Sequence, residues 1–261
     1  MNKDKRLSTS RAKAISRDTT RPISHSAGFS LIELSIAIVV ITLLLGSLLV
    51  PLSTQVDKRR YAQTELQVDD IREALIGFAL ANRFLPCPAI SASDGREDRD
   101  TGTNACTDPG SGPKRDGFIP WVALGVSPYD AWGNLIRYSV DPDFARSDPN
   151  FYFTLGDTGD IRVRDRDNTG ATVDLTNNEI PAVIISHGKN GYGGISSAGV
   201  ARAIPGSWTG DESDNDTNTT LFYSRKRTEE TSGTGGEFDD IVAWVPLNQL
   251  FARMVSAGRL P

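Results

Sequence analysis

The chain has 261 residues, with 33 acidic and 28 basic side chains and a formal net charge of −5. Residues 1–28 hold seven lysines and arginines against two aspartates, so they carry +5 and the rest of the chain carries −10. Nucleic-acid binding needs clustered cations that face phosphates, and this acidic balance argues against it. The residues after position 52 are numerous enough for one domain.

An apolar run fills residues 29–52 and carries one formal charge, Glu33. As a helix it would be about 36 Å long, enough to cross a hydrocarbon core of about 30 Å. A secretory signal peptide is the alternative, but its apolar core is usually about 7–15 residues long and ends in a small-residue cleavage site. We therefore predict a transmembrane helix at 29–52, with the basic residues 1–28 in the cytoplasm under the positive-inside rule.

Residues 53–86 show the spacing of an amphipathic helix. Their apolar side chains recur at steps of three and four: Val68, Ile71, Leu75 and Phe78. We expect this stretch to continue the span as one long helix. It should bend near Pro51, because the proline ring removes a backbone hydrogen bond, and end at Pro86.

The exported part should be rich in β-structure. Five apolar patterns predict strands, at residues 136–140, 151–155, 161–163, 182–185 and 241–245. Residues 205–237 are polar enough for an exposed excursion with one short strand at 221–223. Helical spacing near the end, with Gly258 as a stop, predicts a short C-terminal helix. The expected fold class is therefore α+β.

The two cysteines, Cys87 and Cys106, both lie on the exported side. In an oxidising compartment a disulfide is the expected state, and a free catalytic thiol or a metal ligand is the alternative. The bond would tie down the loop 87–106, which lies in a stretch rich in Gly, Pro, Asp and Ser.

The segment Gly28-Phe29-Ser-Leu-Ile-Glu33-Leu resembles the N-terminal signature of type IV pilins and type II secretion pseudopilins. In that family a prepilin peptidase cuts after the glycine, the new N-terminal Phe is methylated, and the acidic fifth residue of the mature chain is used in filament assembly. The resemblance implies these roles for Gly28, Phe29 and Glu33. A generic single-pass anchor would leave Glu33 unexplained, since a carboxylate in lipid costs about 2.5–3.5 kcal/mol.

Two stretches of the head are similar to major pseudopilins. Asp130-Ala-Trp-Gly133-Asn-Leu-Ile-Arg-Tyr138 is similar to their D-x-W-G-N-x-x-x-Y turn and strand. Ser186-His-Gly-Lys-Asn-Gly191, together with Phe238-Asp-Asp-Ile241, is similar to their glycine-rich calcium loop. The resemblance makes Asp239 and Asp240 the candidate calcium ligands, and carboxylates that simply face water are the alternative. We expect no other cofactor.

Other acidic stretches fit a calcium loop poorly. The segment 165–170 imitates the opening of an EF-hand loop, but Thr176 stands at the twelfth position, where a bidentate Glu belongs. Asp214 and Asp216 are followed by Thr219 where the central Gly is required. Solvated acidic loops are the simpler interpretation of both stretches.

An enzyme is not expected. His187 is the only histidine after residue 28, and a Cys87 or Ser nucleophile beside it would lack a nucleophile-elbow motif. An adhesive or ligand-binding tip subunit, whose head recognises a surface or glycan, is the alternative function. Tryptophans could line a ligand groove in such a head, and the chain has four of them: Trp121, Trp132, Trp208 and Trp244. Trp208 is the candidate ligand contact because it lies in the polar excursion.

We expect four segments: a removed leader at 1–28, an assembly helix at 29–52, its amphipathic outer half at 53–86 and an exported head at 87–261. The resemblance implies a pilin-like fold, with the long helix packed on an antiparallel sheet. The long leader and large mature chain favour a minor pilin or minor pseudopilin. Its expected partners are the prepilin peptidase, an inner-membrane assembly platform and other subunits. The protein would lie in the bacterial inner membrane with its head in the periplasm, and then in a periplasmic or extracellular filament.

Overall fold

The structure is a computed structural model that describes residues 28–108, 112–150, 152–167, 169–176, 180–206, 208–217 and 220–260. The side chains of residues 46–52, 108, 112 and 113 are outside this description. The leader up to residue 27 and the side chain of Pro51, where a bend was expected, therefore lie outside the described residues. The chain divides into two compact units, Met1–Leu52 and Ser53–Pro261.

The helix α1 (Leu31–Asn82) contributes to both units. It begins after Ser30, whose carbonyl accepts a hydrogen bond from the Leu34 N–H at 3.0 Å. The predicted span 29–52 is partly described, since its last seven side chains are not. Among the described residues, no helix is both long enough and apolar enough to cross a membrane.

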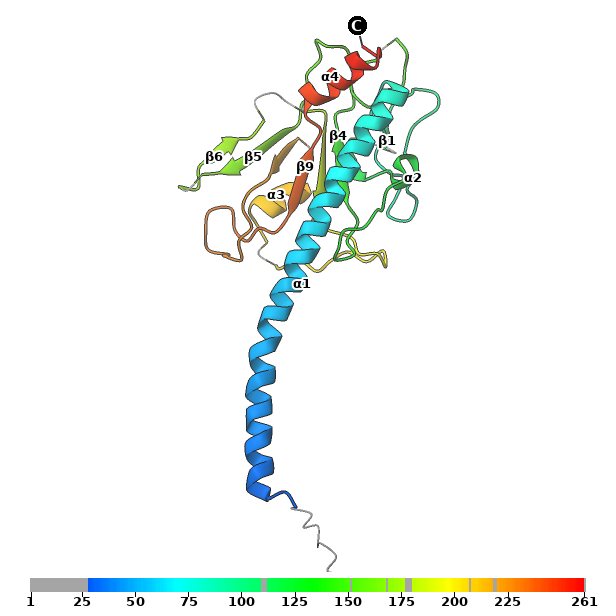
Figure 1. Ribbon diagram of the computed structural model, residues 1–261. Helices are drawn as coiled ribbons and strands as arrows, with labels where there is room; N and C mark the ends of the chain where they lie inside the picture. Colours follow the sequence, from blue (N-terminus) through cyan, green and yellow to red (C-terminus); the bar gives the residue numbers. More distant parts are fainter. Residues whose placement is uncertain are drawn as a thin grey trace, which may run out of the picture. The chain divides into compact units, whose positions relative to one another are not determined.

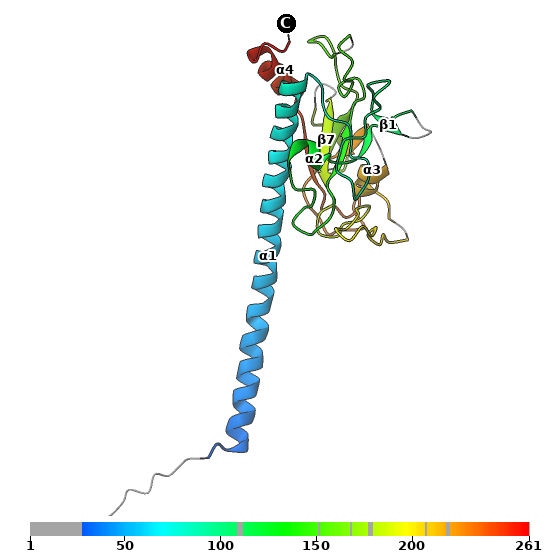
Figure 2. The same cartoon turned by 90° about the vertical axis from the view of Figure 1, so that its right-hand side faces the viewer.

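The second unit is built on a four-stranded antiparallel sheet. Its strands, in spatial order, are β3 (Asp116–Phe118), β4 (Arg137–Val140), β7 (Ala182–Ser186) and β9 (Ile241–Trp244). Figure 2 shows the second half of α1 along one face of this sheet. All five residues of β7 are buried, because both faces of the strand are covered.

A second sheet has three strands, in the order β6 (Thr172–Asp174), β5 (Arg162–Arg166) and β8 (Leu221–Tyr223). β5 pairs in parallel with β8, whereas the expected antiparallel sheet is the main sheet that packs on α1. The parallel pair needs a long connection, and the chain between residues 166 and 221 supplies it. A two-stranded ribbon, β1 (Thr107–Asp108) with β2 (Gly112–Pro113), completes the β-structure of the described residues.

The core joins α1 to the main sheet. Val68, Ile71 and Leu75 are 2%, 1% and 0% exposed, as their spacing predicts, whereas Phe78 is only half-buried. They pack with inward residues of the sheet such as Ile184. Burial of apolar surface stabilises a fold by about 25 cal/mol per Å² removed from water. The apolar face of α1 therefore holds the second half of the helix to the sheet.

In the described part of the chain, three further helices surround the sheets (Figure 1): α2 (Trp121–Leu124), α3 (Asp211–Thr217) and α4 (Leu247–Ser256). α4 is the predicted C-terminal helix, and it buries Leu250 and Met254 against the core. Arg253 of α4 also pairs with Glu73 of α1, at 2.8 Å between Nη1 and Oε2.

Two sequence-based expectations need correction. Residues 152–155 form no strand, and Phe151 lies outside the described residues; Phe153 instead stacks on Phe144, with ring centroids 4.7 Å apart, inside the core. The segment 205–237 is not an exposed excursion throughout, because its helix α3 buries Asp211, Glu212 and Asn215. The short strand expected inside it is present as β8.

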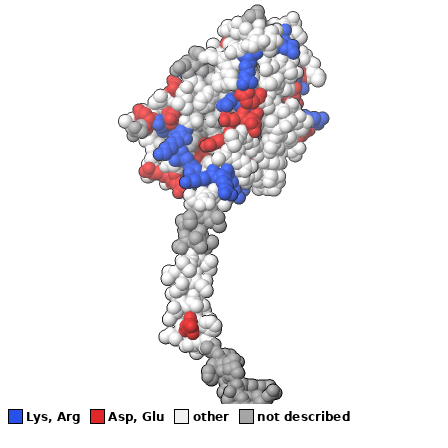
Figure 3. Space-filling model, in the orientation of Figure 1, with Lys and Arg blue, Asp and Glu red and all other residues white. Residues whose placement is uncertain are grey.

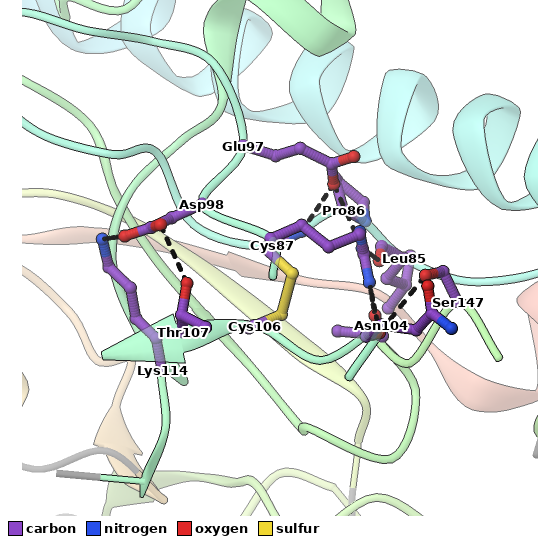
Figure 4. The surroundings of a disulfide bond; sticks show 12 residues. Leu85, Pro86, Cys87, Glu97, Asp98, Asn104, Cys106, Thr107, Lys114 and Ser147 are labelled. Carbon is purple, nitrogen blue, oxygen red and sulfur yellow. Dashed lines mark hydrogen bonds and ion pairs between the residues drawn. A yellow bond between two sulfur atoms is a disulfide. The ribbon is translucent and has the colours of Figure 1, made fainter. Parts of the chain in front are cut away.

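The loop that follows α1 is closed by a disulfide between Cys87 and Cys106 (Figure 4). Both half-cystines are buried. Around the bond, the Glu97 carboxylate accepts the Cys87 N–H at 3.1 Å, and Lys114 pairs with Asp98 at 2.9 Å. These contacts hold a segment that contributes few apolar side chains to the core.

We predict that Cys87→Ala combined with Cys106→Ala lowers the free energy of unfolding of residues 53–261 by about 3 kcal/mol, the chain-entropy value for a loop of this length. Denaturant unfolding measures the loss. Val255→Ala, at a side chain 46% exposed in α4, is the matched control and should change stability by less than about 0.5 kcal/mol. Equal stability of the double variant and the wild type would contradict the assignment.

Candidate functional site

The N-terminal signature lies at the start of α1. Gly28 and Phe29 precede the first helical residue, and Phe29 is 81% exposed. A Cβ placed on Gly28 would meet no other atom within 4 Å. The bond between Gly28 and Phe29 therefore joins two exposed residues that precede the helix. Glu33 follows in the first turn of the helix.

The first half of α1 exposes its apolar side chains. Every large apolar side chain of residues 29–45 is between 47% and 88% exposed, the extremes being Val40 and Leu31. A continuous apolar surface of this kind marks an interaction surface for protein or lipid. Glu33 is its single charged residue.

A second candidate site lies at one end of the main sheet. β7 and β9 pair with Ser186 opposite Ile241, so the loop 187–191 lies beside residues 239–240. Within that loop, the Asn190 N–H donates a hydrogen bond to Oδ2 of Asp239 at 2.9 Å. The structure thus brings together the two segments whose sequences resemble a calcium loop.

Gly188 is required for this approach. Its φ is 58°, and a Cβ there would lie 2.3 Å from the backbone oxygen of Asp239. The D-x-W-G-N turn supports the same loop: Oδ2 of Asp130 accepts the Ser186 hydroxyl at 2.7 Å, and the Asn134 amide donates to the Gly188 carbonyl at 3.0 Å.

Glu212 of α3 is the third carboxylate of the site, and the sequence analysis missed it. Its side chain accepts the Asp239 N–H at 2.5 Å and the Asn190 amide at 3.0 Å. One oxygen from each of Glu212, Asp239 and Asp240 lies within 4.8 Å of the others. We call these three residues the carboxylate cluster.

The carboxylate cluster is buried and only partly satisfied. Glu212, Asp239 and Asp240 are 2%, 8% and 7% exposed. Asn215 donates to Oδ2 of Asp240 at 2.8 Å, but Oδ1 of Asp239 and Oδ1 of Asp240 have no hydrogen-bond partner among the described residues. Nδ1 of His187, 3.6 Å from Oδ1 of Asp240, also lacks one within the described chain.

Burial and mutual repulsion perturb the cluster electrostatically. Burial, followed by repulsion from Asp240 and Asp239, raises the pKa of Glu212 to about 8. Burial also raises the pKa of Asp239 to about 6, against the Asn190 hydrogen bond, which lowers it. The neighbouring carboxylates thus disfavour the ionised forms of Glu212 and Asp239, which a bound cation would favour.

The donor set fits a hard cation. Calcium takes oxygen ligands at about 2.3–2.6 Å, so two ligands of one ion lie at most about 5 Å apart. The cluster oxygens meet that limit, and the two unpartnered oxygens give coordination positions that no donor among the described residues fills. The Asn190 side chain, which donates to Glu212, adds a further polar group beside the carboxylate cluster.

Other candidate residues take structural roles. Oδ1 of Asp167 accepts the Thr169 and Ala171 N–H groups in a hairpin turn, so it orders a loop. Asp216 lies 4.0 Å from Arg137, the distance joining Oδ1 to Nη1. Cys87 is bonded to Cys106 and is no nucleophile.

Trp208, the tryptophan expected to contact a ligand, lies against Tyr192 at a centroid distance of 6.1 Å in an edge-to-face contact. Trp132 makes a similar contact with Tyr61, at 4.6 Å. Both rings therefore pack on other aromatic rings of the head.

Comparison with known protein families finds a match for one region of the chain. Residues 23–49 match the family model of the prokaryotic N-terminal methylation motif. No curated protein and no solved structure matches the chain significantly. The match covers Gly28, Phe29 and Glu33, so the chain carries the N-terminal signature of type IV pilins and pseudopilins, which are processed as prepilins.

Proposed function

We propose that the chain is a prepilin whose mature form is a structural subunit, a minor pilin or minor pseudopilin, of a type IV pilus or type II secretion pseudopilus. The observation that carries the proposal is the methylation motif at 23–49, together with the exposed apolar side chains of residues 29–45. An α+β head with α1 packed on an antiparallel sheet supports it. Its partners are the prepilin peptidase, an assembly platform in the inner membrane and other subunits.

In this proposal the first half of α1 passes from lipid to neighbouring subunits during assembly. Lipid covers the apolar side chains before assembly, and the helices of other subunits cover them afterwards. Glu33 then pairs with the amine of Phe29 on a neighbouring subunit, because either charge left alone in a low-dielectric setting is penalised. The pair sets the stagger between subunits.

Processing gives the first test. Coexpression with a prepilin peptidase should yield a mature protein that begins at Phe29, methylated at its amine, as read by N-terminal mass spectrometry. Gly28→Leu should leave the leader attached, because the peptidase requires the glycine in this family. The wild-type chain retaining residues 1–28 beside an active peptidase would reject the proposal.

Assembly gives the second test. Glu33→Gln removes the charge and should lower incorporation into filaments more than about tenfold, since breaking a buried ion pair costs about 3–5 kcal/mol. Membrane insertion and cleavage should persist. Thr42→Leu is the matched control, because among the described residues the Thr42 hydroxyl donates to the Ile38 and Val39 carbonyls of its own helix and to no others. Wild-type incorporation of the Glu33 variant, by immunoblot of sheared filaments, would show that the carboxylate sets no stagger.

We also propose that the carboxylate cluster binds calcium. The support is the approach of Glu212, Asp239 and Asp240 and the two carboxylate oxygens without partners. The bound ion would tie α3 to the loop 187–191 and to the start of β9. The head would then be more stable in a compartment that supplies the ion.

Calcium at a hundredfold excess over its dissociation constant should stabilise the head by about 2.7 kcal/mol relative to a chelator. Thermal unfolding with and without the chelator measures this difference. Asp240→Asn should abolish it, whereas Asp167→Asn, at an exposed loop carboxylate, should leave it unchanged. An unfolding midpoint of the wild type that does not respond to calcium would refute binding without bearing on prepilin processing.

A further inference from the structure

β9 lies at the edge of the main sheet. Within the described residues it pairs with β7 alone. The Val245 N–H donates to the Ala182 carbonyl at 3.0 Å, so the backbone N–H of Val245 points toward β7. Residues on an antiparallel strand point their backbone groups alternately toward and away from the partner, so those of Val242 and Trp244 point away from β7. No described residue accepts or donates a hydrogen bond there.

The free edge opens into a groove. Two neighbouring cavities, of about 600 and 450 Å³, are both lined by Glu65, Ser224, Ile241 and Val242. One wall is α1, and the other is the segment 224–227 that follows β8. We call this space the β9 groove. It extends along all of β9, which at about 3.4 Å per residue is roughly 13 Å long.

The edge carries none of the usual protection against pairing. Exposed edge strands are commonly blunted by lysines, prolines or bulges, but β9 reads Ile-Val-Ala-Trp and Pro246 comes only after the strand ends. The recess between the two walls replaces that protection. It excludes the edge of another folded sheet, whereas a single extended strand can enter.

The wide end of the β9 groove is cationic. Lys58, Lys226 and Arg227 line the larger cavity and are exposed. Neither lysine has a carboxylate partner in the described part of the chain, and Arg227 lies over the Tyr61 ring at 4.0 Å. Figure 3 shows lysine and arginine side chains gathered on this face of the head.

Acidic side chains at this end do not cancel the charge. Asp239 and Asp240 line the same cavity, but both are more than nine-tenths buried within the carboxylate cluster. Glu65 is the exposed carboxylate among the residues of this cavity. The groove therefore offers backbone hydrogen bonds along its length and positive charge at one end.

We propose that the β9 groove receives an extended, acidic segment of a partner polypeptide, which adds to the main sheet as a fifth strand beside β9. Backbone hydrogen bonds to Val242 and Trp244 supply affinity, and acidic side chains that meet Lys58, Lys226 and Arg227 supply selectivity. This inference goes beyond the proposed function, and neither leader processing nor calcium binding is needed for it.

The test uses the full chain purified in detergent micelles and fluorescein-labelled heptapeptides of alternating Thr and Val. One peptide carries two aspartates at one end, and its counterpart carries two lysines. Fluorescence anisotropy should show the acidic peptide binding about tenfold more tightly than the basic one, the effect of two exposed ion pairs. The acidic peptide with alternate backbone nitrogens methylated should not bind, because it cannot extend the sheet.

Two variants test the surface. Val242→Pro removes an N–H that points away from β7, so the sheet loses no ladder bond while the edge loses a donor. It should weaken binding at least about tenfold, the effect of about 1.4 kcal/mol. Val242→Thr is the control that keeps the donor and should bind as the wild type does. Lys226→Glu should abolish the preference for the acidic peptide.

Hydrogen exchange keeps the test independent of how well the proline variant folds. In the wild type, the bound acidic peptide should slow amide exchange at β9 and leave exchange at β3, the opposite edge, unchanged. Failure of the acidic peptide to bind, equal binding of its N-methylated form, or unprotected β9 amides would each overturn the proposal.

Discussion

The antiparallel pairing of β7 with β9 is the contact on which both head sites depend. Its register is locked because each face of the pair lies in a different core: Ile184 and Ala243 pack toward α1, whereas Val183 and Ile185 pack toward the second sheet. A slip of one residue would exchange the two faces, which neither core would accommodate. The position of the loop 187–191 beside residues 239–240 therefore follows from burial elsewhere in the strands.

The carboxylate cluster opposes stability in the absence of a cation. The nearby buried carboxylate of Asp211 is neutralised by Arg166 and Arg225, at 2.6 Å each, but no such cation reaches Glu212 among the described residues. Apolar side chains would hold α3 against the sheet at least as well, since replacing buried charges with apolar groups is often neutral or stabilising. The burial of three carboxylates here is consistent with the proposed ion binding.

Much of the fold was predictable, and the reason differs from element to element. The strands β7 and β9 were recognisable because continuous burial demands continuous apolar sequence. The α3 segment was not, because Asp211 and Asn215 are buried through tertiary partners that no local pattern encodes: two arginines and the backbone of Tyr223. Asp239 and Asp240 were found through resemblance, whereas Glu212 lies 27 residues earlier in the chain and gave no local signal. Phe153 shows that alternating apolar residues also suit a loop that inserts one ring into the core.

Glu33 poses a separate energetic problem at the start of α1. A carboxylate in the first turn gains about 0.3–1 kcal/mol from the helix dipole, which does not offset the cost of about 2.5–3.5 kcal/mol for placing it in lipid. A nearby cation would offset this cost, and the proposed cleavage before Phe29 would create one, four residues before Glu33. A pair formed within each subunit would satisfy the charge in any arrangement of neighbours, so it would carry no information about stagger. A pair formed between subunits forms at one relative height, and we infer that only this arrangement gives the lone carboxylate of the apolar segment a role in assembly.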